Sequence, residues 1–312
     1  MQKFGLIFPG QGSQKLGMLS ELAREYPLIQ QTFAEASEAL EIDLWDIAQL
    51  DAGNSLDQTH ITQPVLLTAS IAIWRLWNQL QGSQPSILAG HSLGEYSALV
   101  CADVLAFTDA VKLVHKRGEF MQATVAPGAG KMAAIVGLDN YKIIEICQQA
   151  AEGMVVSAAN FNSSGQTVIA GDTAAVERAM SLCKEAGAKR ALALNVSVPS
   201  HCALMKPAAD KLEKEFDKVE FHQASIPIVQ NVSAQICKEP NEIKENLIKQ
   251  LYTPVLWVDS VQLLHKAGVT KLIECGPGKV LCGLIRRIES ELLCLGSDEP
   301  QSLNAAIAEV ST

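Results

Sequence analysis

Apolar positions along the chain follow two spacings. Short apolar runs, typical of strands buried in a sheet, occupy residues 4–8, 86–89, 226–232, 271–274 and 292–295. Longer segments with apolar residues three and four positions apart, typical of amphipathic helices, occupy residues 64–80, 108–123, 203–216, 258–267 and 279–288. Because the strands alternate with helices, the pattern predicts an α/β fold whose sheet is mostly parallel, with helices on both faces.

The middle of the chain has a different order of elements. Residues 132–137, 154–160, 166–171 and 190–196 are predicted as strands, and residues 141–151 and 174–186 as helices. The resulting order, β-α-β-β-α-β, is that of a ferredoxin-like unit. The Pro- and Gly-containing segment 127–130 marks its start. We therefore expect a ferredoxin-like subdomain at residues 128–197, inserted into a large domain that residues 1–127 and 198–312 form.

A serine lies on a tight turn between a predicted strand and a predicted helix. Residues 90–94 read Gly-His-Ser-Leu-Gly, directly after the apolar run 86–89. A serine at such a turn has its hydroxyl exposed above the sheet, close to the free N–H groups of the helix N-terminus. This arrangement is typical of α/β-hydrolases, so we expect a large α/β-hydrolase-like domain with Ser92 as its nucleophile.

A serine nucleophile needs a base, and histidine is the usual one near neutral pH. His201 is the best candidate, because it lies on the loop through which the chain re-enters the large domain; a purely structural loop histidine is the alternative. His91 is expected to point away from Ser92 and to orient the turn. No acidic residue between Ser92 and His201 ends a strand of the main sheet, so the sequence favours a Ser–His dyad with a neutral acceptor, such as a backbone carbonyl, orienting the histidine.

Two further features bear on the chemistry at Ser92. The glycine-rich turn after the first strand does not have the G-x-G-x-x-G spacing of dinucleotide loops. Gln11 in this turn is instead a candidate oxyanion donor through its backbone N–H, paired with that of Leu93. Arg117 lies in a predicted helix, where most arginines are simply solvated. Its functional alternative is a guanidinium that pairs with a substrate carboxylate.

Composition excludes several classes of protein. The chain has 312 residues, of which 48% are hydrophobic and 19% charged, so it can form a large buried core. A formal net charge of −9 argues against a nucleic-acid partner and against attraction to anionic lipid. The eight cysteines include no C-x-x-C pair, the apolar run at the N-terminus is too short for a signal peptide, and the longest apolar stretch, residues 65–77, is too short for a membrane span. We expect a cytoplasmic protein, with no membrane association and no metal site.

Six sequence blocks together resemble a known family. They are FPGQGSQ at 8–14, QPVLLT at 63–68, GHSLGE at 90–95, Arg117-Gly118 with Met121-Gln122, VPSH at 198–201 and GPGKVL at 276–281. In this order, and over nearly the whole chain, they are similar to the malonyl-CoA:acyl carrier protein transacylases, the acyltransferases of type II fatty acid synthesis. The family also has a large domain with a ferredoxin-like insert.

The resemblance implies a role for each matching residue. Ser92 becomes malonylated and His201 is the base and later the acid. The backbone N–H groups of Gln11 and Leu93 hold the oxyanion, and the backbone carbonyl of Gln250 orients the histidine. Arg117 pairs with the free malonyl carboxylate. The remaining substrate-binding residues are Met121, Asn160, Asn162 and Ser200. The implied substrates are malonyl-CoA and holo-acyl carrier protein, and no cofactor is needed.

The carrier protein of this pathway is acidic, so an acidic enzyme needs a local basic surface on which to dock it. The candidates are Lys189, Arg190, Arg286 and Arg287, although a charge pair is most often a solvated face. Nothing in the sequence requires more than a monomer. The sequence departs from the family at Ser164, where proline is usual, and at Lys131, where a small residue is more common.

Two other classes of function remain open from sequence. A serine hydrolase shares the turn around Ser92 but needs neither Arg117 nor a thiol acceptor. A non-catalytic module that binds carrier protein has no need of Ser92 and His201 together. Malonyl, methylmalonyl and similar carboxylated units, and fatty acid as well as polyketide pathways, are all compatible with these residues.

Overall fold

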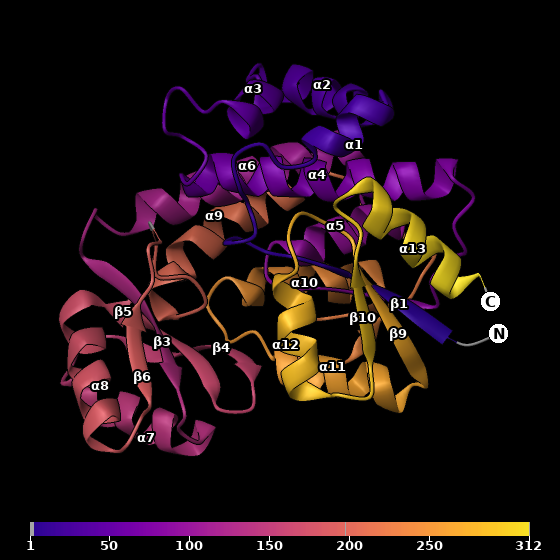
Figure 1. Cartoon of the computed structure of the whole chain (residues 1–312). Coiled ribbons are helices and arrows are strands. Elements are labelled where there is room, and N and C mark those ends of the chain that lie inside the picture. The colour runs from indigo at the N-terminus through magenta and orange to yellow at the C-terminus, as the bar shows by residue number, and fades with distance from the viewer. Residues whose placement is uncertain (1–2, 197, 312) are drawn as a thin grey trace.

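The larger of two separate sheets runs through the centre of the molecule (Figure 1). A computed structural model describes residues 3–196 and 198–311. The sheet has the order β10-β9-β1-β2-β7-β8, and only the β7–β8 pair is antiparallel. Its strands are β1 (Lys3–Phe8), β2 (Ile87–Gly90), β7 (Ile228–Val229), β8 (Ile236–Cys237), β9 (Val269–Glu274) and β10 (Leu293–Gly296). The predicted α/β fold with a mostly parallel sheet is confirmed.

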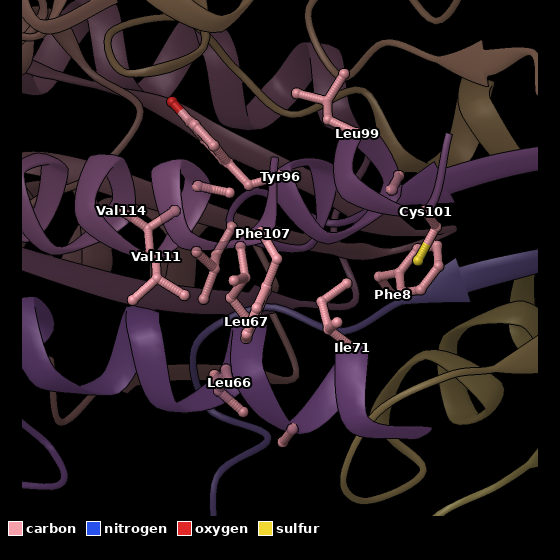
Figure 2. Close-up of a cluster of buried hydrophobic side chains, with 14 of the residues drawn as sticks. Phe8, Leu66, Leu67, Ile71, Tyr96, Leu99, Cys101, Phe107, Val111 and Val114 are labelled. Atoms are coloured by element: carbon pink, nitrogen blue, oxygen red, sulfur yellow. The ribbon is translucent and has the colours of Figure 1, made fainter. Parts of the chain in front are cut away.

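Helices cover both faces of this sheet. Successive residues of a strand point to opposite faces, so Leu6 and Phe8 of β1 pack into one core, and Ile7 between them packs into the other. The first core is formed with α1 (Ser20–Glu25), α2 (Leu28–Leu40), α3 (Leu44–Gln49), α4 (Thr59–Gln79), α5 (Gly94–Cys101), α6 (Phe107–Thr124), the short 3₁₀ helix η1 (Ala203–Met205), α9 (Lys206–Phe216), α10 (Pro240–Gln250) and α13 (Pro300–Val310). The second core is formed with α11 (Trp257–Lys266) and α12 (Val280–Ile288). Figure 2 shows part of the first core, where side chains of α4, α5 and α6 gather together with Phe8 of β1.

Helix α4 contains a proline, and its neighbour α6 compensates for it. Pro64 has no N–H group to donate to the carbonyl of His60 one turn earlier. His115 of α6 donates its Nδ1–H to that carbonyl instead, at 2.8 Å. The hydrogen bond joins α4 to α6 one turn away from Gln63 and close to Arg117, and it fixes the two helices that carry these side chains.

The smaller sheet is antiparallel throughout and has the order β4-β5-β3-β6. Its elements are β3 (Gly130–Val136), α7 (Asn140–Ala151), β4 (Val156–Ser163), β5 (Gln166–Asp172), α8 (Thr173–Glu185) and β6 (Arg190–Ala193). Ala133 and Ile135 face α7 and α8, whereas Met132 on the other face packs near Cys202. The β-α-β-β-α-β order is the predicted one. The domain limits around residues 128 and 197 stay a prediction, and residue 197 lies outside the described residues.

The strand predicted at residues 226–232 is too long. Only Ile228 and Val229 form β7, because the chain turns at Gln230. The backbone of Gln230 exchanges hydrogen bonds with Gln235 and Ala234, which close this turn. Asn231 therefore leaves the sheet at its carboxyl end, beside the strand β2 that leads to Ser92.

The helices and the cysteines bear on the predictions of a cytoplasmic protein without membrane association. None of the helices within residues 3–196 and 198–311 combines the length and the apolar character needed to cross a bilayer. All eight cysteines are free thiols, and six of them are buried.

Candidate active site

Ser92 occupies a sharp turn between β2 and α5. Its φ is +53°, in the left-handed region that non-glycine residues rarely adopt. The turn brings the backbones so close that a Cβ on Gly90 would lie 2.0 Å from the carbonyl carbon of Gly94, and one on Gly94 would lie 2.1 Å from the carbonyl oxygen of Phe8. Glycine is therefore required at both flanks. Such strain is held in place by the surrounding structure and is typical of functional sites.

His201 reaches Ser92 from the loop before η1. The distance from Ser92 Oγ to His201 Nε2 is 2.8 Å, and that from His201 Nδ1 to the Gln250 backbone carbonyl is 2.6 Å. A carbonyl oxygen only accepts, so Nδ1 carries the hydrogen and the lone pair of Nε2 faces the serine hydroxyl. His201 has a φ of +61°, so both members of the pair have strained backbones. This geometry can move the proton of Ser92 to His201.

The environment of His201 keeps its imidazole neutral. Burial, and to a smaller extent the nearby positive charge of Arg117, lower the pKa of His201 from its ordinary value to about 3, although the hydrogen bond to Gln250 opposes the shift. The imidazole is therefore uncharged at neutral pH and able to accept a proton. No carboxylate within the described residues contacts Nδ1; Asp103, Asp109, Asp139 and Asp172 are not its partners.

Gln11 and Leu93, the two predicted oxyanion donors, border the same cleft as Ser92. Leu93 directly precedes α5, and Gln11 follows β1; both residues line the cleft above Ser92. Within residues 3–196 and 198–311, neither N–H donates to a backbone acceptor. Gln11 is held in place by its side chain, whose Nε2 donates to Thr59 Oγ1 at 3.2 Å. The two donors are available for a ligand oxygen.

Arg117 is not a solvated helix residue. Its side chain is 2% exposed. Nη1 donates to Gln63 Oε1 at 2.7 Å and Nη2 to Gln250 Oε1 at 3.0 Å, while Nη2 lies 3.5 Å from Ser92 Oγ. The guanidinium is thus fixed by two neutral amides and directed toward the candidate nucleophile. A fixed cation in this place is a ready partner for an anionic group on the substrate.

Three residues of the site were given no role by the sequence analysis. Gln63 holds Arg117 as described. Asn231 accepts the backbone N–H of Ser92 through Oδ1 at 2.7 Å and donates from Nδ2 to the carbonyl of Gly90 at 2.6 Å, so it bridges the two sides of the strained turn. Glu95 accepts a hydrogen bond from Gln250 Nε2 at 2.7 Å. Gln63 and Glu95 lie within the sequence blocks that resemble the family, and this position could have pointed to them. No sequence signal pointed to Asn231.

The remaining predicted residues line one cleft with Ser92. Met121, Asn160, Asn162 and Ser200 all border it, whereas Gln250 lies fully buried behind it. His91 borders the cleft too, but its Nε2 bonds Asn162 Oδ1 at 2.8 Å and its ring packs edge-on against Trp257. The structure thus brings together every predicted catalytic and substrate residue. Its described part contains no group of three or more His, Cys, Asp or Glu side chains placed to hold a metal ion.

The two sequence departures have local partners. Lys131 of β3 forms an ion pair with Glu177 of α8. Ser164 lies in the two-residue turn between β4 and β5, followed by Gly165 with a φ of +71°. Neither residue borders the cleft around Ser92.

Comparisons with known proteins agree over nearly the whole chain. Residues 6–288 match the family model described as acyl transferase domain. The chain is 54% identical over 309 residues to the malonyl CoA-acyl carrier protein transacylase of Salmonella typhimurium, which covers 99% of this chain and 100% of the relative.

Solved structures give the same result. An acyl carrier protein S-malonyltransferase from Vibrio cholerae superposes with a TM-score of 0.95 at 56% identity, covering 97% of this chain and 99% of that one. A malonyl-transacylase in complex with its type II polyketide synthase acyl-carrier protein superposes with a TM-score of 0.97 at 51% identity, covering 98% and 99%. The chain belongs to the malonyl CoA-acyl carrier protein transacylase family.

Proposed function

We propose that this protein transfers a malonyl group from malonyl-CoA to the phosphopantetheine thiol of acyl carrier protein, in fatty acid biosynthesis, through a malonyl-Ser92 intermediate. One observation carries the proposal: a buried guanidinium lies 3.5 Å from the hydroxyl of a serine that is already bonded to a neutral histidine. A nucleophile with a fixed cation beside it suits an acyl group that ends in a carboxylate.

The first half-reaction acylates the serine. His201 takes the proton of Ser92 as the oxygen attacks the thioester carbonyl of malonyl-CoA. The Gln250 carbonyl keeps the imidazole in the required tautomer and holds it toward the serine. The protonated His201 then gives its proton to the departing thiolate, and free CoA thiol leaves. In the second half-reaction the carrier-protein thiol attacks the ester, with His201 acting first as base toward that thiol and then as acid toward Ser92 oxygen.

The oxyanion formed in each half-reaction is held by the backbone N–H groups of Gln11 and Leu93. Donors of this kind act on charge that exists only in the transition state, and each contributes about 2.7–4 kcal/mol. The partial positive charge at the N-terminus of α5 adds to them. The absence of other acceptors for these two N–H groups among the described residues supports the assignment.

The cleft suits a short, charged acyl group. Its volume is about 150 Å³, which is small beside the roughly 300–1,000 Å³ of sites for drug-sized ligands. We assign the malonyl carboxylate to Arg117 and the walls of the acyl site to Met121, Asn160, Asn162 and Ser200. An acetyl group lacks the carboxylate and leaves the buried guanidinium without an ionic partner, which disfavours it.

The neutral state of His201 leads to a prediction on pH. Because burial lowers the pKa of this imidazole to about 3, the base stays deprotonated when the pH falls through 6.5. We expect the rate constant of acyl-enzyme formation, measured by rapid quench between about pH 5 and pH 7, to lack an acid limb centred near 6.5. A limb at that position, with the protein still folded by circular dichroism, would contradict the assigned environment of the base.

The acyl carrier protein docks, in this proposal, on basic residues around the turn between β4 and β5. Lys189 borders the same surface hollow as Ser164 and Gly165 of that turn, and Arg287 Nη1 donates to the neighbouring Gln166 Oε1 at 2.6 Å. Together with their chain neighbours, these residues form an exposed basic set from both domains: Lys189, Arg190, Arg286 and Arg287. Such a set is complementary to an acidic partner.

Charge reversal tests this docking surface. We expect a variant with Lys189→Glu and Arg286→Glu to lower kcat/KM for carrier protein about 10-fold or more, through a slower association that depends on salt. Acylation by malonyl-CoA should be unchanged, because neither side chain borders the cleft. Reversal of the exposed Lys211 and Lys214 on α9 is the matched control. An unchanged kcat/KM in the first variant would place the docking surface elsewhere.

Several finer points belong to the same proposal. A large domain like that of the α/β-hydrolases is supported by the strand–turn–helix around Ser92. A cytoplasmic site of action is supported by the eight free thiols. We further propose that the protein acts as a monomer, needs no cofactor, and binds neither nucleic acid nor membrane, as its net charge of −9 favours.

Transfer is separated from hydrolysis by the fate of the acyl group. We expect malonyl-CoA consumption to stop after about one turnover per enzyme when no thiol acceptor is present, and to continue when holo-acyl carrier protein is added. Steady release of free malonate without acceptor, at a rate equal to transfer, would instead identify a thioesterase.

A further inference from the structure

Two oppositely charged side chains are buried behind Ser92. Arg117 is 2% exposed and Glu95 is 1% exposed. They are joined through the amide of Gln250, whose Oε1 accepts from Arg117 Nη2 at 3.0 Å and whose Nε2 donates to Glu95 Oε2 at 2.7 Å. The mechanism above uses the guanidinium but not the carboxyl group.

The carboxyl group of Glu95 has an asymmetric environment. Oε2 accepts hydrogen bonds from Gln250 Nε2 and, at 3.3 Å, from the backbone N–H of Asn231. Oε1 is buried and has no partner among the described residues. One oxygen is therefore held by donors whether or not the group is ionised, and the other is free to carry a proton.

The charges that face Glu95 come from few elements. Arg117 from α6 is the cation, and Tyr96 is the residue after Glu95 on α5. Gln250 from α10 and Asn231 from the β7–β8 connection are neutral. Burial raises the pKa of Glu95 to about 7, against the lowering effect of the Gln250 and Asn231 hydrogen bonds and of Arg117. The group can thus exchange a proton near neutral pH.

With Glu95 ionised, the buried charges behind Ser92 sum to zero only while the site is empty. Arg117 is positive and an ionised Glu95 is negative, so their sum is zero. If the malonyl carboxylate pairs with Arg117, which rests on the proposed function, the same buried region contains two anions and one cation. An uncompensated buried charge is costly, and a second anion close to a carboxylate raises its pKa.

We propose that Glu95 is a charge-balancing positioning residue, which is ionised in the empty site and takes up one proton from solvent when the carboxylate of the acyl group pairs with Arg117. The proton goes to Oε1, and Oε2 continues to accept from Gln250. The contacts of Gln250 with Arg117 and, through its backbone, with His201 therefore persist in both states. The residue matches the charge of the site to a dicarboxylic acyl group.

The proton balance of acylation makes this step measurable. Ser92 loses a hydrogen and the CoA thiol gains one, so the transfer itself neither takes up nor releases a proton. The reaction of Glu95 carboxylate with a solvent proton to give the acid is then the net change. At about pH 7.5, a pKa that rises from about 7 by one or two units gives an uptake of roughly half to three-quarters of a proton per malonylated site.

The experiment measures this uptake directly. Full-length protein is mixed with malonyl-CoA in weak buffer with a pH indicator, and the malonylated fraction is quantified by intact mass in the same sample. We expect uptake in proportion to the malonyl adduct, none with acetyl-CoA, and none in Glu95→Gln, which keeps an acceptor for Gln250. Malonyl transfer by the wild type should also weaken above about pH 8, and that by Glu95→Gln should not.

Three outcomes would contradict the role of Glu95 or the proposed transfer. A malonyl adduct on the wild type without proton uptake would overturn the role of Glu95 and leave the transfer reaction intact. Equal uptake in Glu95→Gln would assign the proton to another group. No malonyl adduct at all would overturn the proposed transfer itself. If the Glu95 variant does not fold, the proton uptake of the wild type with malonyl-CoA and with acetyl-CoA still tests the proposal.

Discussion

Replacing Ser92 with alanine should abolish acyl-enzyme formation and lower malonyl transfer by roughly 10⁵-fold or more, as expected when a covalent nucleophile is removed. The remaining donors and cation can still bind malonyl-CoA but provide no atom for it to acylate. Intact mass of the variant after incubation with malonyl-CoA gives the first readout, and the rate of malonyl transfer to carrier protein gives the second.

The matched control for this prediction is Ser97→Ala. Ser97 lies on α5, the helix that follows Ser92, is buried, and has an Oγ without a hydrogen-bond partner among the described residues. The same substitution five residues away removes a hydroxyl that contacts neither His201 nor the cleft, so acylation should remain near the wild-type rate. A malonyl adduct on the Ser92 variant at wild-type yield would show that another residue is acylated.

The second large effect concerns the choice of acyl group. Arg117→Ala should lower kcat/KM for malonyl-CoA by about 150- to 5,000-fold, because a buried charge-assisted contact of this kind contributes on the order of 3–5 kcal/mol. Acetyl transfer should fall much less, since the acetyl group makes no contact that depends on the guanidinium charge. The ratio of the two kcat/KM values, measured with one enzyme preparation, is the readout.

The Arg117→Ala prediction has two controls, the acetyl transfer rate and the Arg117→Lys variant. The acetyl rate reports any general damage, because Gln63 and Gln250 each lose a donor in the variant. Arg117→Lys keeps the charge but has a single ammonium in place of the planar fork, so its discrimination should fall between the wild type and the alanine variant. If both acyl groups lost rate equally, the carboxylate would have to bind elsewhere.

Local sequence signals were enough to single out the candidate nucleophile. The glycines at positions 90 and 94 are demanded by backbone contacts within the strand–turn–helix itself, so the five-residue pattern was sufficient to predict an exposed serine. The histidine was harder, because its contact with Ser92 spans 109 residues of sequence. Its place on the re-entry loop allowed a structural interpretation as well, and the family resemblance favoured the catalytic one.

The residues that support the site depend on the fold as a whole. Asn231 reaches the backbone of Ser92 across 139 residues, and Glu95 meets Gln250 across 155. Neither hydrophobic spacing nor local motifs carry information on such contacts. Arg117 illustrates the same point: its helix pattern favours a solvated side chain, and only tertiary contacts, among them those with Gln63 of α4 and Gln250 at the end of α10, bury it. The strand predicted at 226–232 failed because the turn at Gln230 is fixed by backbone contacts with residues 234 and 235.

The central claim is that Ser92 holds a malonyl group between two thiols. It is tested most directly by intact mass of the wild-type protein in two steps, first after mixing with malonyl-CoA and then after adding holo-acyl carrier protein. We expect a gain of one malonyl group, located on Ser92 by peptide mapping, which then disappears from the enzyme and appears in equal amount on the carrier protein. An adduct that is lost only to water, or malonylated carrier protein formed without any enzyme adduct, would contradict it.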